Sequence, residues 1–271
     1  TKLIMYSYLL LMYERDENME PIEIESAKDS SKVMTGSHDI NKWLEGGYEN
    51  GIITMFYGPA ASGKSNFVLL AACHLAKKDK KIVFIDTEAS VSLERIKQIS
   101  GGIPDMILKN IIILKPVNFY EQKKAFMKLL KEYKSNNIGL IVVDSMVMFY
   151  RLELAEARKN GIEEVRRINN ELANQMKALY EIARKQDIPV LITTQVYNDY
   201  LNEEDWLKGK EAGVNVVGGD ILKYWSKCII ELKNKNGKKR AIIRKHRSLA
   251  EKELNFEICN EGIRKSFRIF G

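Results

Sequence analysis

A glycine-rich loop between a strand-like and a helix-like segment limits the possible folds of this chain more than any other feature of the sequence. The loop, Gly58–Ser65 (GPAASGKS), fits the pattern GxxxxGK[ST] without a departure. The residues before it (GIITMFY) are typical of a buried strand, and the apolar residues after it are typical of a helix. A loop in this position presents backbone N–H groups and the positive end of the helix dipole to an anion. We therefore predict a phosphate-binding site at the start of this helix.

The residue types in the loop indicate what each would bind. Gly58 and Gly63 let the backbone curl, Lys64 is placed to reach the β- and γ-phosphates, and the Ser65 hydroxyl is placed to ligate Mg²⁺. The expected cofactors are therefore ATP and Mg²⁺. The predicted nucleotide-binding residues are Gly58, Pro59, Ala60, Ala61, Ser62, Gly63, Lys64, Ser65 and Asn66.

Three polar residues lie at the ends of other predicted strands. Asp144 ends the run LIVVD, at the edge where an open α/β sheet binds its ligands, and we expect it to hold the Mg²⁺ shell. Glu88 follows the run KIVFID and is placed to accept a proton from an attacking water. Gln195 follows PVLITT, where it is placed to contact the γ-phosphate. The predicted catalytic residues are Glu88, Lys64 and Gln195, and the predicted Mg²⁺ ligands are Ser65 and Asp144.

Strands and helices alternate through most of the chain. The predicted strands are 51–57, 81–86, 110–114, 139–144 and 189–194, and the predicted helices are 66–76, 91–100, 119–133 and 162–186. Strands rich in Val and Ile that are separated by helices form a mainly parallel sheet covered on both faces. The last helix carries one apolar stripe, formed by Val165, Ile168, Leu172, Met176, Leu179 and Ile182.

The end of the chain has a different pattern. Segments 228–232 and 240–244 flank Asn236-Gly237, which is a strong hairpin signal, and segments 254–258 and 263–269 flank a second turn. The predicted fold class is α/β, a P-loop NTPase core whose mainly parallel sheet is flanked by helices, with antiparallel β-hairpins at the C-terminus. Residues 1–18 are expected to be an N-terminal extension of unknown role, and residues 19–271 the ATPase core.

The composition is that of a folded protein without a membrane anchor. Apolar residues make up 45% and charged residues 29% of the 271 positions, which excludes a disordered chain. No apolar run approaches the ~20 residues of a membrane-spanning helix. Three widely spaced cysteines and three histidines provide neither a disulfide framework nor a dedicated zinc site. We expect a cytoplasmic protein with no membrane partner.

The basic charge is concentrated near the end of the chain. The formal net charge is +7, and residues 231–247 hold eight Lys and Arg residues against one acid. Such a basic stretch is typical of a surface that binds DNA. A solvated, lysine-rich surface without a partner explains the charge equally well. Contacts to phosphates would make binding steeply dependent on salt. The DNA-binding candidates in this stretch are Lys235, Lys238, Lys239 and Arg240.

These motifs, taken in order, resemble the RecA/Rad51/RadA recombinase superfamily, and within it the archaeal RadB group of recombinase paralogues. The resemblance covers roughly residues 33–271. It rests on TGSHDINKWLEGG (Thr35–Gly47), GPAASGKSN, FIDTEASVSLERI, LIVVDSMVMFYR, LITTQV, the pair Gly218-Gly219 and the closing basic hairpins. It implies a RecA-like core, an archaeal source and a possible homo-oligomer.

The resemblance also implies roles for particular residues. Glu88 would activate water, and Gln195 would couple the nucleotide state to DNA. Segments Arg151–Gly161 and Asn198–Val217 fall where the family has its two DNA-facing loops, and the first contributes Arg158 and Lys159 as DNA-binding candidates. Lys245 and Arg247 resemble cations that related ATPases insert into a neighbouring subunit's nucleotide site, where they would stabilise charge on the leaving phosphate.

Three departures from the family indicate an accessory role. The chain contains no Phe-x-x-Ala docking motif, and its length leaves no room for the helix-hairpin-helix domain of full recombinases. The second loop, Asn198–Val217, carries five acids and two lysines, so it repels phosphates.

We therefore expect an ATP-binding, weakly ATP-hydrolysing and DNA-binding protein that assists homologous recombination and DNA repair. Its Mg-dependent hydrolysis would be slow and stimulated by DNA, and its protein partner would be the main recombinase or another repair protein. Two alternatives stay open. One is a nucleotide-gated adaptor without strand-exchange activity, and the other is a KaiC-like regulatory ATPase, which shares the glycine-rich loop.

Overall fold

The computed structural model describes residues 32–132, 138–198 and 214–267, which fall in one compact unit of the chain, 31–271. The predicted extension, 1–18, lies outside the described residues. The strands are β1 (Lys32–Val33), β2 (Tyr48–Glu49), β3 (Ile53–Gly58), β4 (Lys81–Asp86), β5 (Ile111–Leu114), β6 (Ile138–Asp144), β7 (Val190–Asn198), β8 (Val214–Val216), β9 (Ser226–Lys235), β10 (Lys238–Lys245), β11 (Glu253–Cys259) and β12 (Gly262–Lys265). The helices are α2 (His38–Trp43), α3 (Lys64–Ala76), α4 (Leu93–Ser100), α5 (Pro104–Leu108), α6 (Phe119–Glu132), α7 (Met148–Ala157), α8 (Ile162–Gln186) and α10 (Gly219–Trp225).

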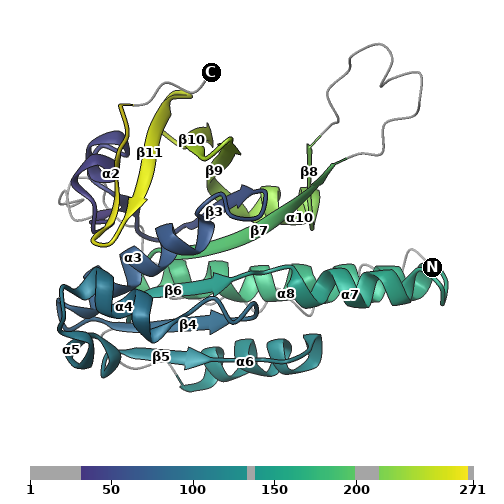
Figure 1. Cartoon of the computed structure of the whole chain (residues 1–271). Coiled ribbons are helices and arrows are strands. Elements are labelled where there is room, and N and C mark those ends of the chain that lie inside the picture. The colour runs from purple at the N-terminus through teal and green to yellow at the C-terminus, as the bar shows by residue number, and fades with distance from the viewer. Residues whose placement is uncertain (1–31, 133–137, 199–213, 268–271) are drawn as a thin grey trace, which may run out of the picture. The chain divides into compact units, whose positions relative to one another are not determined.

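One large sheet organises the structure (Figure 1). Its strand order is β12-β11-β10-β9-β3-β7-β6-β4-β5, and β8 pairs with β7. The strands β3, β7, β6, β4 and β5 are mutually parallel, as the Val- and Ile-rich segments predict. Parallel strands need helical crossovers, so helices cover both faces, and β4 and β6 are buried along almost their whole length. The prediction of a mainly parallel, helix-flanked sheet is confirmed.

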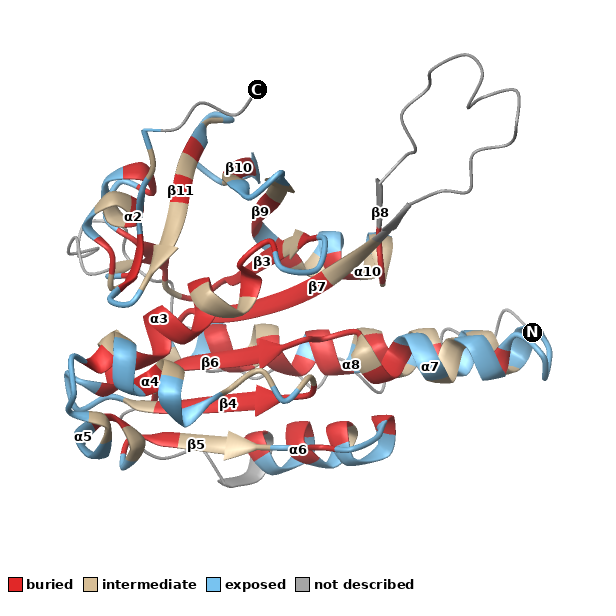
Figure 2. Ribbon diagram, in the orientation of Figure 1, coloured by how far each residue is buried: buried red, intermediate tan, exposed pale blue. Residues whose placement is uncertain are grey.

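Two apolar cores lie on opposite faces of the sheet (Figure 2). One gathers around α3, where Phe67 packs on Phe56 and Phe256. The other includes buried residues of α8, whose observed ends, Ile162 and Gln186, match the prediction. Five of the six residues in the predicted stripe are buried, and Val165 is partly buried. Because the stripe is buried, its apolar residues repeat with the helical period, and that spacing predicted both ends of the helix.

The C-terminal strands continue the same sheet. Strand β9 pairs in parallel with β3, with Tyr57 opposite Glu231, and then turns back through Asn236-Gly237 into β10. Both turn residues have positive φ, 52° and 79°, the conformation that an Asn-Gly hairpin turn requires. Strands β11 and β12 form the second predicted hairpin, and β12 ends at Lys265. The predicted strand, 263–269, is too long, because Ser266 and Phe267 are not part of β12, and its predicted end, Ile269, lies outside the described residues.

Four of the described helices, α2, α5, α7 and α10, were not predicted. Helix α7 covers most of the segment Arg151–Gly161, which we expected to be a loop, so this expectation is wrong up to Ala157. Helix α5 is a single short turn after Gly101-Gly102. Among the described residues, no helix combines the length and the apolar character that a membrane span requires.

Candidate functional site

The phosphate loop lies between β3 and α3, as predicted. Gly63 adopts a left-handed conformation (φ 107°) immediately before α3, and Ala61 is also left-handed (φ 57°). The Lys64 ammonium donates hydrogen bonds to the carbonyls of Gly58 and Pro59, each at 2.9 Å, so the loop closes around its own lysine. A Cβ atom on Gly58 would lie 2.2 Å from the Leu232 carbonyl oxygen, which explains the glycine at this position.

The loop has the properties of an anion site. The Ser62 hydroxyl is buried and has no hydrogen-bond partner among the described residues. Burial lowers the pKa of Lys64, and the nearby carboxylates of Glu88 and Asp144 oppose that shift. A triphosphate would supply acceptors for both groups. The residues present therefore fit a nucleotide.

A magnesium ion would need ligands from the nucleotide as well as from the protein. Within the described residues, no group of three or more His, Cys, Asp and Glu side chains is arranged to hold a metal ion. Mg²⁺ commonly takes one or two protein ligands, substrate phosphate oxygens and water. Ser65, partly exposed at the start of α3, and Asp144, at the end of β6, fit that pattern.

Asp144 is fixed by neighbours that the sequence analysis did not identify. It is 1% exposed and accepts hydrogen bonds from the hydroxyls of Ser90 (2.6 Å) and Thr193 (2.5 Å). Ser90 also donates its backbone N–H to Asp86, which faces Asp144 across β4 and β6. The run DTEAS contains this arrangement, because a serine four residues after a strand-ending Asp is placed to return to it. That signal alone does not identify the contact with Asp144.

Glu88 and Gln195 are in direct contact. Gln195 Nε2 donates to Glu88 Oε1 at 2.8 Å, and Gln195 faces Gly58 in the register of β3 and β7. The structure therefore brings Lys64, Glu88, Asp144 and Gln195 to one edge of the sheet. Gln195 is also linked to Val217, whose N–H donates to the Gln195 carbonyl at 3.2 Å. Val217 directly precedes Gly218-Gly219, so the strand end and this glycine pair are one connected unit.

A groove lies beyond this link. Its volume is about 490 Å³, and it is lined by α7, by Asn169 of α8 and by residues 216–221. Arg151 and Arg158 are its two basic side chains. Lys159, the other candidate in this segment, is exposed and forms an ion pair with Glu156 at 2.8 Å. Most of the second predicted DNA-facing loop, residues 199–213, lies outside the described residues.

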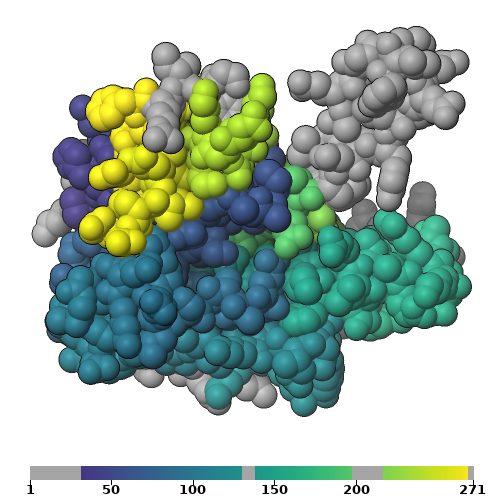
Figure 3. Space-filling view, viewed as in Figure 1, coloured from purple at the N-terminus to yellow at the C-terminus, as the bar shows by residue number. Residues whose placement is uncertain are grey.

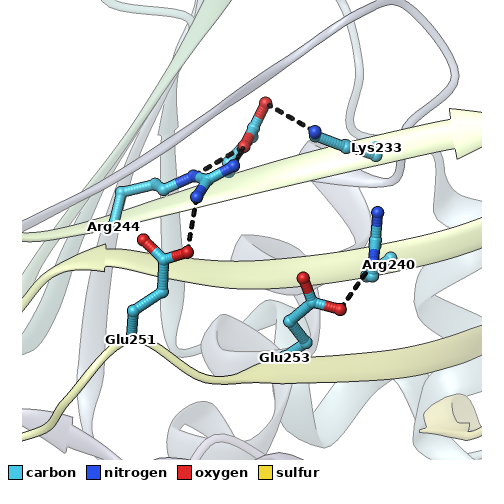
Figure 4. Close-up of polar contacts among 6 residues, drawn as sticks. Lys233, Arg240, Arg244, Glu251 and Glu253 are labelled. Atoms are coloured by element: carbon cyan, nitrogen blue, oxygen red, sulfur yellow. Dashed lines mark hydrogen bonds and ion pairs between the residues drawn. The ribbon is translucent and has the colours of Figure 1, made fainter.

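Much of the basic C-terminal stretch is paired with acids from β9, β11 and the connection before β11 (Figure 4). Arg244 contacts Glu231 at 2.6 Å and Glu251 at 2.7 Å, and Arg240 contacts Glu253 at 2.6 Å. Lys239 donates instead to the Ala61 carbonyl of the phosphate loop at 2.8 Å.

Two lysines at the hairpin tip remain exposed. Lys235 and Lys238 face each other across the hairpin, and neither has an ion-pair partner among the described residues. Like charges directly opposite one another on a sheet are destabilising, and a bound anion would relieve them.

Lys245 and Arg247 lie away from the chain's own phosphate loop. Lys245 donates to the Lys223 and Ser226 carbonyls at 3.0 and 2.8 Å. Ser226 faces Ile53 at the start of β3, the edge opposite to the phosphate loop. Arg247 Nε donates to Glu49 Oε2 at 2.9 Å. The role of both cations in a neighbouring subunit's site stays a prediction.

Comparison with known proteins decides the family. A sequence model of the Rad51 family matches residues 27–266. The chain belongs to the Rad51 family, in its RadB branch. It is 38% identical to the DNA repair and recombination protein RadB of Methanobrevibacter smithii, over 87% of this chain and 97% of that protein.

Two further relatives support the RadB assignment. The RadB protein of Methanocaldococcus jannaschii is 40% identical, over 81% of this chain and 96% of that protein. The crystal structure of the RadB recombinase is similar, with a TM-score of 0.69 and 32% identity, over 86% of this chain and 99% of that chain. The predicted RecA-like fold and the predicted family are confirmed.

Proposed function

We propose that this chain binds Mg–ATP at the phosphate loop, hydrolyses it slowly, and binds DNA as an accessory protein of homologous recombination and repair. One observation carries the proposal. The phosphate loop, Glu88, Asp144 and Gln195 meet at one edge of the sheet, and the Gln195–Glu88 hydrogen bond of 2.8 Å joins the hydrolytic carboxylate to the strand that leads to Gly218-Gly219. The RadB relatives are named DNA repair and recombination proteins, which supports the biological role.

The proposed chemistry follows from these positions. The backbone amides of residues 58–66 and the Lys64 ammonium would bind the phosphates, and Ser65 and Asp144 would hold Mg²⁺, which neutralises phosphate charge when bound. Glu88 Oε1 is hydrogen bonded to Gln195, so Oε2 would accept the proton of the attacking water. Formation or loss of the Gln195 contact would report the nucleotide state to Val217 and the groove.

The DNA contacts we propose are Arg151 and Arg158 in the groove, with Lys235 and Lys238 at the hairpin tip. At the hairpin tip, Lys235 and Lys238 have no ion-pair partner among the residues that the structure describes, whereas Arg240 is held by Glu253. Each phosphate contact to duplex DNA contributes about 0.9 to the salt slope of binding, so we expect a modest slope of about 2 to 4. No base-reading element is evident among the described residues, so sequence preference should be weak.

Variants of Lys64 and Glu88 test the proposal. Lys64→Ala should lose ATP binding, measured by equilibrium titration. Glu88→Gln should retain binding and lose turnover by about 10²- to 10⁴-fold, because it removes the general base. Turnover should rise when single- or double-stranded DNA is added. Equal ATP binding by Lys64→Ala and wild type would remove the site assignment, and wild-type turnover in Glu88→Gln would remove the role of Glu88.

The same variants distinguish the proposed ATPase from a nucleotide-gated adaptor. An adaptor needs bound nucleotide but not hydrolysis, so Glu88→Gln would still bind its recombinase partner. The ion pairs that occupy Arg240 and Arg244 favour this second candidate, because they reduce the charge available to DNA. A partner interaction that requires turnover would exclude it.

A further inference from the structure

The C-terminal strands pack against the outer side of the phosphate loop. In the space-filling view, the yellow-green C-terminal strands lie directly against the blue segment that contains β3 and α3 (Figure 3). The Leu232 carbonyl of β9 contacts Gly58, and a Cβ on Gly63 would meet Ile258 and Phe256 of β11 at 3.3 and 3.4 Å. The predicted antiparallel tail is therefore part of the surroundings of the nucleotide site.

Two side chains of the β9–β10 hairpin converge on one atom of the loop. Lys239 Nζ donates to the Ala61 carbonyl oxygen at 2.8 Å, and Asn234 Nδ2 donates to the same oxygen at 3.3 Å. Asn234 and Lys239 are direct partners in the hairpin register. Neighbouring residues on a strand point to opposite faces, so Lys238 points away from the phosphate loop that Lys239 contacts, and it is exposed.

Ala61 is the residue of the loop that most needs such support. Its φ of 57° is left-handed, a conformation that is unfavourable for a residue with a Cβ. Two donors on its carbonyl, one of them a cation, hold the peptide in that orientation. They also polarise the Ala61–Ser62 peptide, whose N–H belongs to Ser62 in the phosphate loop, and a polarised peptide is a stronger donor.

We propose that Lys239 and Asn234 are positioning residues of the nucleotide site, which clamp Ala61 from outside and fix the curvature of the phosphate loop. The inference rests on the proposed function and deepens it. It moves Lys239 from the DNA surface to the nucleotide site and leaves its neighbour Lys238 on the DNA surface. Burial lowers the pKa of Lys239, in keeping with a side chain held against the protein.

Variants of Lys239 and Asn234, with Lys238→Ala as a control, test whether these contacts to Ala61 support ATP binding. Lys239→Ala should raise the dissociation constant for the fluorescent probe mant-ATP about tenfold, and Asn234→Ala about threefold. The matched control Lys238→Ala should stay within twofold of wild type. Lys239→Arg, which keeps the charge and the donor, should recover most of the affinity. Urea unfolding of each variant should show unchanged midpoints, so that the loss of affinity reflects the loop and not the fold.

In DNA binding, the expected effects of the Lys238 and Lys239 variants are reversed. Lys238→Ala should reduce the salt slope for duplex DNA by about 1, and Lys239→Ala should leave it unchanged. Equal mant-ATP affinity in Lys239→Ala and Lys238→Ala, with tight binding by wild type, would overturn the clamp and leave the proposed function standing. Failure of wild type to bind mant-ATP would overturn both.

Discussion

Removing the Arg247 guanidinium is expected to destabilise the fold, because it leaves a nearly buried carboxylate without its ion-pair partner. Arg247 Nε lies 2.9 Å from Glu49 Oε2, and the side chains are 47% and 10% exposed. A hydrogen bond to a charged group contributes about 1.5–3 kcal/mol, and the half-exposed arginine places this pair at the lower end, about 1.5 kcal/mol. For a domain of this size each 1 kcal/mol changes the melting temperature by roughly 2–4 °C. Arg247→Ala should therefore melt roughly 3–6 °C lower.

The assay is thermal unfolding monitored by circular dichroism. A matched control is Lys252→Ala, because Lys252 pairs with Glu45, whose side chain is 60% exposed, and an exposed pair contributes less than about 1 kcal/mol. Adding Glu49→Gln to Arg247→Ala should recover part of the loss, since a neutral amide is easier to bury than a charge. A loss in Arg247→Ala no greater than in Lys252→Ala would refute the reasoning. The double variant also lets a role of Arg247 in a neighbouring subunit be measured with a smaller stability defect.

Three further outcomes follow from contacts described above. Gly58→Ala should lower the free energy of unfolding by about 1–3 kcal/mol, because its Cβ would lie 2.2 Å from the Leu232 carbonyl; wild-type melting would contradict this. Gln195→Ala removes the hydrogen bond to Glu88, so stimulation of turnover by DNA should disappear while DNA-free turnover changes less than about tenfold, and retained stimulation would exclude Gln195 as the link. Burial raises the pKa of the Cys73 and Cys228 thiols to about 12, so at pH 8 a thiol reagent should modify Cys259 first and the other two only after denaturation; three equal rates would argue against burial.

The parallel half of the sheet and its site were predictable because their signals are local. The strands β4, β5, β6 and β7 each contain a short Val- or Ile-rich run. Asp144, which ends β6, and Gln195, which follows the apolar run of β7, lie at the same edge as the phosphate loop. The site residues were placed together by topology alone. Helix α8 was predicted to the residue because its buried stripe has the helical period.

What could not be predicted depends on contacts between distant segments. Helix α7 has no side-chain N-cap, and Leu152 is 55% exposed, so the apolar residues do not form a single face. Arg244 and Glu231 are 13 residues apart, and counting charge along the chain does not show that they pair. The pairing of β9 with β3 joins segments far apart in sequence, and only that pairing brings Lys239 to the phosphate loop.

Strand β3 has four strands on each side in the order of the large sheet. Its backbone amides are hydrogen bonded to β7 on one side and to β9 on the other, so neither side is open to water. Exchange of these amides with deuterated solvent requires the sheet to separate at its centre, and they are expected to be among the slowest in the protein. The phosphate loop therefore follows a strand whose hydrogen bonds are expected to open last, and local opening at the edges of the sheet leaves the start of the loop in place.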